Sequence, residues 1–242
     1  MFINIFGSFH SQKNKNNQDF LFNSSKTKMV LDGCSMGDDF ILSHTEVGSR
    51  LFATLFSQIE PEKRDNPDMF EKNVKYVFNK LLTLFDSKFG EQDKNKIETL
   101  IKFYSFTILV CFELDDGFVV KTMGDGYIIT VNREGQVSYL KLDYDNSPPY
   151  YIYNCIKMDN VKNNIKYDTY RFSKENFLNV GVATDGISAF ANEFSIPIPE
   201  ISKMDTYLLN NDNLPEDRAS VRITAMVNKN KTHFFDDTTL II

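Results

Sequence analysis

Apolar and polar positions alternate near the start of the chain in a way that predicts a β-hairpin. Two short β-prone segments flank the polar stretch 24–27, which has the length and composition of a hairpin loop. If Asn23 pairs with Lys28, the numbers of every pair of facing residues sum to 51. Asp19 then lies opposite Asp32, with the Cβ atoms about 5 Å apart. The pattern therefore predicts two carboxylates that meet at one end of a sheet.

Three further segments have the apolar spacing of amphipathic helices. Residues 43–46, Ser-His-Thr-Glu, have the form of a capping box that opens the first helix. Its expected apolar stripe consists of Val47, Leu51, Leu55 and Ile59. The second helix is expected over 67–88, with a buried side made of Phe70, Val74, Val77, Phe78, Leu81, Leu82 and Phe85. The third is expected over 215–227, with one apolar face of Ala219, Ile223, Met226 and Val227.

The segment 104–142 has a strand pattern, and its apolar runs are separated by glycine-containing turns. We expect these strands to form an antiparallel meander. Residues 143–178 are polar and rich in tyrosine, which predicts an irregular excursion with one strand near 151–156 that shapes a cleft. Short strands follow over 179–184 and at the C-terminal end. Together these elements indicate an α+β fold in which helical layers cover sheets, and we expect 1–242 to form a single domain.

Composition limits the classes of function. The chain has 242 residues, 42% of them hydrophobic, and a formal net charge of −6. Nucleic-acid binding depends on clustered basic residues, so the acidic balance argues against a nucleic-acid partner. No apolar run has the length of a membrane span, which argues against a membrane protein. Three cysteines without CxxC spacing and no secretory signal favour a reducing cytoplasm.

Five aspartates stand at expected strand ends beside glycines or turns. They are Asp19, Asp32, Asp125, Asp185 and Asp236. Like charges that meet at the end of a sheet raise one another's pKa unless a cation compensates them. Carboxylate oxygens are hard ligands that favour Mg²⁺ or Mn²⁺. Taken alone, each aspartate is better explained as a turn residue.

The order and flanks of these motifs resemble those of the metal-dependent protein phosphatases of the 2C type. The matching motifs are 17–19 (Asn-Gln-Asp), 30–33 (Val-Leu-Asp-Gly), 124–126 (Gly-Asp-Gly), 184–186 (Thr-Asp-Gly) and 236–239 (Asp-Asp-Thr-Thr). The resemblance implies a four-layer sandwich, in which two antiparallel β-sheets are flanked by α-helices. It also implies a cleft at one end of the sandwich that holds two Mn²⁺ or Mg²⁺ ions.

The same resemblance implies roles for individual residues. Asp32 would bridge the two ions, and Gly33 would offer its backbone carbonyl. Asp185 and Asp236 would complete the shell of one ion, while Asp19 would serve the other through a water. Asp32, Asp185 and Asp236 are thus the expected catalytic set.

A third, weaker ion is implied between Asp125 and Asp185. The family often has a further acid four residues after the latter, where this chain has Ala189. The third site is therefore the least supported of the expected metal sites.

The chain departs from the family pattern at positions that bind phosphate or transfer protons. Asn14 stands where an arginine usually grips the phosphate, so Lys13 and Lys15 are the candidates for phosphate binding. Gln18 replaces a common glutamate. Cys34 replaces a histidine that is proposed to protonate the leaving group in some members.

The implied reaction is hydrolysis of phosphoserine or phosphothreonine in proteins by direct attack of a metal-activated water on phosphorus. A phosphorylated protein is the expected substrate, and a cognate Ser/Thr kinase is the expected partner in signalling. Two alternatives remain open at this stage. The first is a catalytically weakened regulatory or binding module, and the second is a hydrolase of small phosphorylated metabolites.

Overall fold

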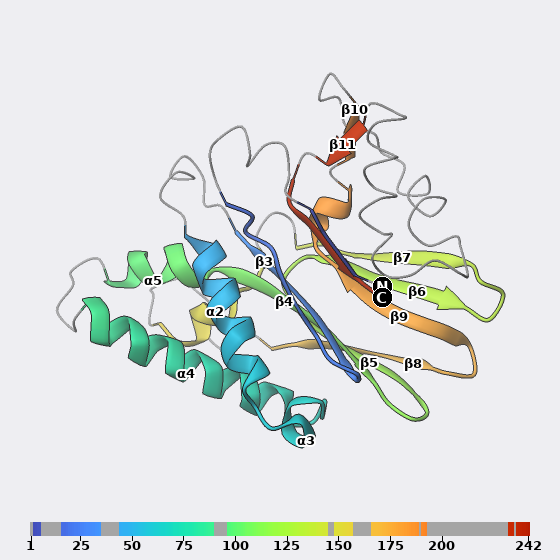
Figure 1. Ribbon diagram of the computed structural model, residues 1–242, viewed down its shortest axis with the longest axis horizontal. Helices are drawn as coiled ribbons and strands as arrows, with labels where there is room; N and C mark the ends of the chain where they lie inside the picture. The colour runs from blue at the N-terminus through green and yellow to red at the C-terminus, as the bar shows by residue number, and fades with distance from the viewer. Residues whose placement is uncertain are drawn as a thin grey trace.

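The computed structural model describes residues 2–5, 16–34, 44–89, 96–144, 148–156, 166–188, 190–192, 232–234 and 236–242. Two five-stranded sheets pack against each other, and helices α2, α4 and α5 lie to one side of the pair (Figure 1). The predicted α+β sandwich of two antiparallel sheets with a helical layer is confirmed. The helix expected over 215–227 lies outside the described residues.

The first sheet has the order β2-β3-β4-β5-β8, and every neighbouring pair is antiparallel. Its strands are β2 (Phe20–Asn23), β3 (Thr27–Gly33), β4 (Phe106–Glu113), β5 (Gly117–Met123) and β8 (Asp168–Ser173). The register of the first hairpin is as predicted, since Asn23 faces Lys28 and Phe20 faces Leu31. Asp19 precedes the first residue of β2, at the open end of this hairpin.

The second sheet has the order β1-β12-β9-β6-β7 and is also antiparallel throughout. Its strands are β1 (Phe2–Ile5), β12 (Thr238–Ile241), β9 (Phe177–Ala183), β6 (Gly126–Asn132) and β7 (Val137–Leu142). A separate two-stranded ladder joins β10 (Phe190–Asn192) and β11 (Thr232–Phe234).

The meander predicted over 104–142 is wrong in one respect, because its strands belong to two sheets. β4 pairs with β5 in the first sheet, whereas β6 pairs with β7 in the second. The chain crosses between the sheets at Gly124 and Gly126, whose φ angles are 99° and 136°. Such angles are accessible to glycine and strained for other residues. Asp125 is therefore held between two glycines at the point where the chain changes sheets.

The helices are α2 (Thr45–Ser57), α3 (Pro61–Arg64), α4 (Phe70–Phe89) and α5 (Lys96–Tyr104), and two 3₁₀ turns are η2 (Tyr151–Asn154) and η3 (Asp185–Ser188). The predicted capping box is wrong: the N-cap is His44, and it makes no side-chain cap hydrogen bond. The strand predicted near 151–156 is also wrong. Backbone N–H groups of Tyr153 and Cys155 donate to carbonyls three residues earlier, which closes tight turns and leaves Ile152 buried.

The buried face of α2 is displaced by one residue from the predicted stripe. Phe52 and Phe56 are fully buried, whereas Val47 and Leu51 keep 39% and 37% of their surface exposed. The Phe52 ring packs with its centroid 5.5 Å from that of Phe106 on β4. Phe52 and Phe56 thus form the most deeply buried face of α2, and Leu55 and Ile59 pack only partly against the same core.

Two apolar cores hold the layers together. One lies between the helices and the first sheet, and the predicted face of α4 contributes to it as expected, through Phe70, Val74, Val77, Phe78, Leu81 and Phe85. The other lies between the two sheets and includes Val30, Leu109, Ile128, Val180 and Val182. Within the described part of the chain, no helix is long and apolar enough to cross a membrane.

Candidate metal centre

The candidate centre lies where several strands end at one end of the sandwich. Asp19 precedes β2, and Asp32 is the penultimate residue of β3. Asp185 follows β9 and opens η3, while Asp236 precedes β12, the neighbour of β9 in the second sheet. The open end of the β2–β3 hairpin and η3 lie at the same end of the molecule (Figure 1). Both sheets therefore contribute carboxylates to this end.

The electrostatics of Asp32 shows that these four aspartates act on one another. Burial is the largest cause that raises the pKa of Asp32 well above its usual value, and the charges of Asp19, Asp185 and Asp236 raise it further. Burial also raises the pKa of Asp185, followed by the charge of Asp236, while a hydrogen bond between the Asp32 and Asp185 carboxyls opposes the rise. Four carboxylates that repel one another in a desolvated space favour occupation by a cation.

Asp19 is the most deeply buried of the five predicted aspartates, with only 3% of its surface exposed. Its Oδ2 accepts a hydrogen bond from Thr184 Oγ1 at 2.7 Å. The Thr184 hydroxyl in turn accepts from the backbone N–H of Thr239 at 2.9 Å. Asp19 Oδ1 has no hydrogen-bond partner among the described residues although it is buried. A buried carboxylate oxygen without a donor is the kind of atom that a bound ion or its water would satisfy.

Asp237 is a buried acid that the sequence did not single out. It is 3% exposed, and its Oδ2 accepts a hydrogen bond from the backbone N–H of Gln18 at 2.6 Å. Its own backbone N–H donates to Asp236 Oδ1 at 2.8 Å. The two neighbouring acids therefore have different roles, since Asp236 belongs to the acidic group and Asp237 fixes the backbone of Gln18 before β2. No spacing in the sequence indicated the second role.

Gln18, which replaces a common glutamate, packs in the interior of the protein and is not exposed at the candidate centre. Its side chain is buried, and Nε2 donates to Thr45 Oγ1 at 3.1 Å. Gly33 lies against the same threonine, because a Cβ atom at this position would lie 2.5 Å from Thr45 Oγ1. The end of β3 and the start of α2 thus approach so closely that only glycine fits between them.

Cys34 and Tyr150 border the centre on a further side. The hydroxyl of Tyr150 donates a hydrogen bond to the Cys34 thiol, and this bond opposes the rise that burial causes in the pKa of Cys34. Burial is likewise the main cause that raises the pKa of Tyr150, and the charges of Asp125 and Asp32 add to it. Tyr150 precedes η2, so the segment after β7 covers this side of the aspartates. The spacing of apolar residues in the sequence did not indicate that Tyr150 borders the centre.

Asp125 belongs to the periphery of the same group. Burial raises the pKa of Asp125 to about 6, and the charge of Asp185 is the next largest cause. The structure thus brings Asp125 within electrostatic reach of Asp185. Lys13, Lys15 and Asn14, which the sequence relates to phosphate binding, lie outside the described residues.

The carboxylate oxygens of this group suit a divalent cation that keeps several waters better than an ion that is bound by protein atoms alone. In the ranges that the structure describes, no three His, Cys, Asp or Glu side chains are grouped so that they could hold one ion directly. Mg²⁺ commonly keeps several waters and takes only one or two carboxylates from a protein. Mutually repelling acids and the unsatisfied Oδ1 of Asp19 suit such an ion.

Comparison with known proteins gives a consistent result at the level of family and fold. The sequence profile described as Protein phosphatase 2C matches residues 6–219. No curated protein matches the sequence significantly.

Several solved structures, most of them described as phosphatases, are similar across 99% of this chain. PppA of Pseudomonas aeruginosa, described as a key regulatory component of its type VI secretion system, has a TM-score of 0.61 at 12% identity, with 94% of that chain covered. The serine/threonine phosphatase Stp1 of Staphylococcus aureus has a TM-score of 0.57 at 13% identity, with 92% covered. The catalytic domain of the serine/threonine phosphatase PstP, solved with two manganese ions, has a TM-score of 0.56 at 10% identity, with 94% covered.

Proposed function

From the premise that this chain belongs to the protein phosphatase 2C family, we propose that it is a metal-dependent phosphohydrolase that acts on phosphoserine or phosphothreonine in proteins. The observation that carries the proposal is the mutual repulsion of Asp19, Asp32, Asp185 and Asp236 in a desolvated space at the end of both sheets. The presence of two manganese ions in the similarly folded PstP supports two divalent ions. Mn²⁺ and Mg²⁺ both suit oxygen ligands.

The proposed ligands follow from the positions of the acids. Asp32 would lie between the two ions, and the backbone carbonyl of Gly33 would add a second oxygen from the end of β3. Asp185 and Asp236 would serve one ion together with waters, since no three of the described acids are close enough to hold an ion directly, and Asp19 would contact the other ion through water. When bound, the two ions supply an activated water and neutralise charge on the phosphoryl oxygens.

The chain's own residues hold this arrangement in place. The Thr184 hydroxyl fixes one oxygen of Asp19 and leaves the other oxygen available. Asp237 anchors the backbone of Gln18 and thereby the approach to β2. Tyr150 excludes water from the side on which Cys34 lies, since it is almost completely buried there.

Three finer assignments belong to the same proposal. A third, weaker ion would bind between Asp125 and Asp185, and Lys13 and Lys15 would attract the phosphate. The partner would be a phosphoprotein together with its kinase, in a reducing cytoplasm. The three cysteines, none of which forms a disulfide, support this location.

The direct test is release of phosphate from p-nitrophenyl phosphate and from phosphoserine and phosphothreonine peptides, with Mn²⁺ or Mg²⁺ added to metal-stripped protein. We expect metal-dependent turnover that falls by about 10³-fold or more in Asp32→Ala. Asp115→Ala is the matched control, because Asp115 is an exposed turn residue outside the acidic group.

The outcomes separate the proposal from its alternatives. Metal binding without turnover of any of these substrates would show the regulatory module instead. Turnover of p-nitrophenyl phosphate and small phosphorylated metabolites, but of no phosphopeptide, would show a metabolite hydrolase. Equal activity in Asp32→Ala and in the unaltered protein would refute the metal centre.

A further inference from the structure

A groove on the outer surface lies between the end of α2, helix α3 and the first half of α4. Its volume is about 470 Å³. Leu55 and Ile59 line one wall, and Tyr76 of α4 lines the other. Tyr76 keeps 49% of its surface exposed, although it lies beside the helical core.

The apolar wall comes from the stripe that the sequence predicts to be buried. Leu55 and Ile59 are its last two members, and both pack only partly against the core that Phe52 and Phe56 fill. The stripe continues along α2 through the exposed Leu51. The core therefore buries Leu55 and Ile59 only in part, and both residues also line the groove.

Three lysines and one glutamate line the same groove and give it a net charge of +2. Lys63 forms an ion pair with Glu60 at 2.6 Å. The Nζ atom of Lys80 lies 4.6 Å from the centroid of the Tyr76 ring. Lys72 forms no ion pair within the described part of the chain. The charge of the groove is opposite in sign to the net charge of −6 of the whole chain.

Specific contacts hold the walls of the groove in position before any ligand binds. Asn73 is buried at the base of α4, and its Nδ2 donates to the carbonyl of Lys63 in α3 at 2.8 Å. Arg64 Nη1 donates to the carbonyl of Ser57 at the end of α2 at 3.3 Å. Because the three helices are tied to one another, binding does not have to order them.

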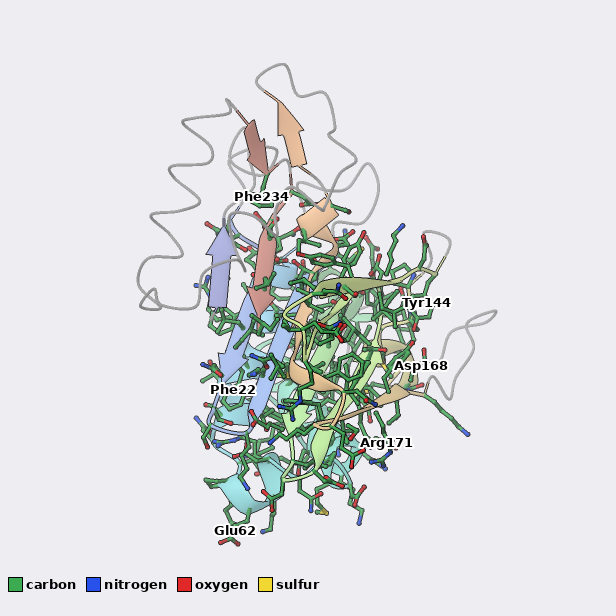
Figure 2. The ribbon with its side chains drawn as sticks, turned by 90° about the vertical axis from the view of Figure 1, so that its right-hand side faces the viewer. Phe22, Glu62, Tyr144, Asp168, Arg171 and Phe234 are labelled. Atoms are coloured by element: carbon green, nitrogen blue, oxygen red, sulfur yellow. The ribbon has the colours of Figure 1, made fainter. Side chains whose placement is uncertain are left out.

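The groove is remote from the candidate metal centre. Glu62 of α3 and Phe234, which closely precedes Asp236, lie at opposite ends of the molecule (Figure 2). A ligand in the groove would leave the aspartates accessible.

We propose that this groove binds an acidic segment of a partner protein that inserts one large apolar side chain between Ile59 and Tyr76. The apolar walls would bury the anchor, and the lysines would pair with acidic residues on either side of it. This binding requires neither catalysis nor metal, so it is independent of the proposed phosphatase activity.

The test uses a short fluorescein-labelled peptide with several glutamates around one central phenylalanine, and measures its binding by fluorescence anisotropy. We expect saturable binding that weakens as salt is raised above 0.15 M, where the screening length is about 8 Å. Replacing the phenylalanine by alanine, or the glutamates by glutamines, should each weaken binding.

Two double variants, each of which replaces two lysines by glutamates, identify the binding site. Lys72→Glu combined with Lys80→Glu should weaken binding by about tenfold or more. Lys75→Glu combined with Lys166→Glu changes two exposed lysines that do not line the groove, and should leave binding within about twofold. Tyr76→Ala should weaken binding without changing its dependence on salt.

Three outcomes would overturn the proposal. The first is absence of saturable binding, and the second is an equal loss of binding in both pairs of lysine variants. The third is self-association of the protein that the groove variants abolish, because the groove would then hold a second copy of this chain. Turnover of p-nitrophenyl phosphate, measured on the same variants, reports separately on the metal centre.

Discussion

Replacement of Asp125 by asparagine should stabilise the ion-free protein at neutral pH. Burial raises the pKa of Asp125 from 3.8 to about 6, and repulsion by Asp185 adds to the effect. A group that holds its proton more tightly in the folded state destabilises that state once it is ionised. Asparagine has nearly the same shape and cannot ionise, so it removes this penalty.

The magnitude follows from the difference in pKa of about two pH units. Each unit corresponds to about 1.4 kcal/mol, which gives an upper value of about 3 kcal/mol. Asp125 is only half-buried, and solvent screening reduces the free energy to about 1 to 2 kcal/mol. For a chain of this length the melting temperature should then rise by about 3 to 6 °C.

The pH dependence provides the sharper criterion. The folded state binds more protons than the unfolded state between pH 3.8 and about 6. The penalty is therefore fully present above pH 6 and disappears as the pH falls toward 3.8. We expect the gain in Asp125→Asn to be full at pH 8 and to vanish near pH 4.

The assay is thermal unfolding in a chelating buffer from pH 4 to pH 8. Asp116→Asn is the control, because it removes a carboxylate from an exposed turn at the other end of β5. A gain that is the same at every pH, or no gain at pH 8, would refute the electrostatic explanation. Addition of Mg²⁺ should reduce the difference, since the proposed ion would compensate the carboxylate in the unaltered protein.

Three further predictions concern the surroundings of the centre. Thr184→Val removes the hydroxyl that donates to Asp19, so the free energy of unfolding in urea should fall by about 1 to 3 kcal/mol; an unchanged value would contradict the hydrogen bond. Phe52→Ala leaves a cavity among three aromatic rings and should cost about 3 to 5 kcal/mol in the same measurement, whereas a loss below about 1 kcal/mol would show that this core collapses freely. Tyr150→Phe removes the hydrogen bond that lowers the pKa of Cys34, so alkylation of Cys34 by iodoacetamide at pH 8 should slow; faster alkylation would indicate that Tyr150 mainly shields the thiol.

The parts of the fold that depend on short-range spacing could be predicted from the sequence. The loop 24–27 fixed the register of the first hairpin, because a tight loop leaves few ways to pair its two strands. The face of α4 could also be read from spacing, since six of its seven predicted apolar residues are buried in the core and the seventh, Leu82, is partly buried against it. The acidic motifs could be recognised in the sequence for a similar reason, because each stands at one end of an apolar strand.

The remaining errors come from choices that local spacing does not decide. α2 has two neighbouring rows of apolar residues, and spacing alone allows either row to face the sheet. In the structure, the row that contains Phe52 and Phe56 is the buried one. The change of sheet at Gly124 depends on two positive φ angles, which look in the sequence like an ordinary turn. Tyr150 reaches the centre through a segment without periodicity, so only the folded chain brings it to Cys34.

The cost of assembling the acids and the benefit of binding an ion have the same physical origin. Burial, and after it mutual repulsion, raises the pKa values of Asp19, Asp32 and Asp185 above their usual range, so protons and the proposed divalent ions would compete for the same carboxylates. An ion at 100 times its dissociation constant would stabilise the folded state by about 2.7 kcal/mol. Protons partly fill this role at pH 5, so the stabilisation by a fixed concentration of Mn²⁺ should be larger at pH 8 than at pH 5. If the proposed metal centre is present, the stability of the fold itself will therefore depend on divalent ions.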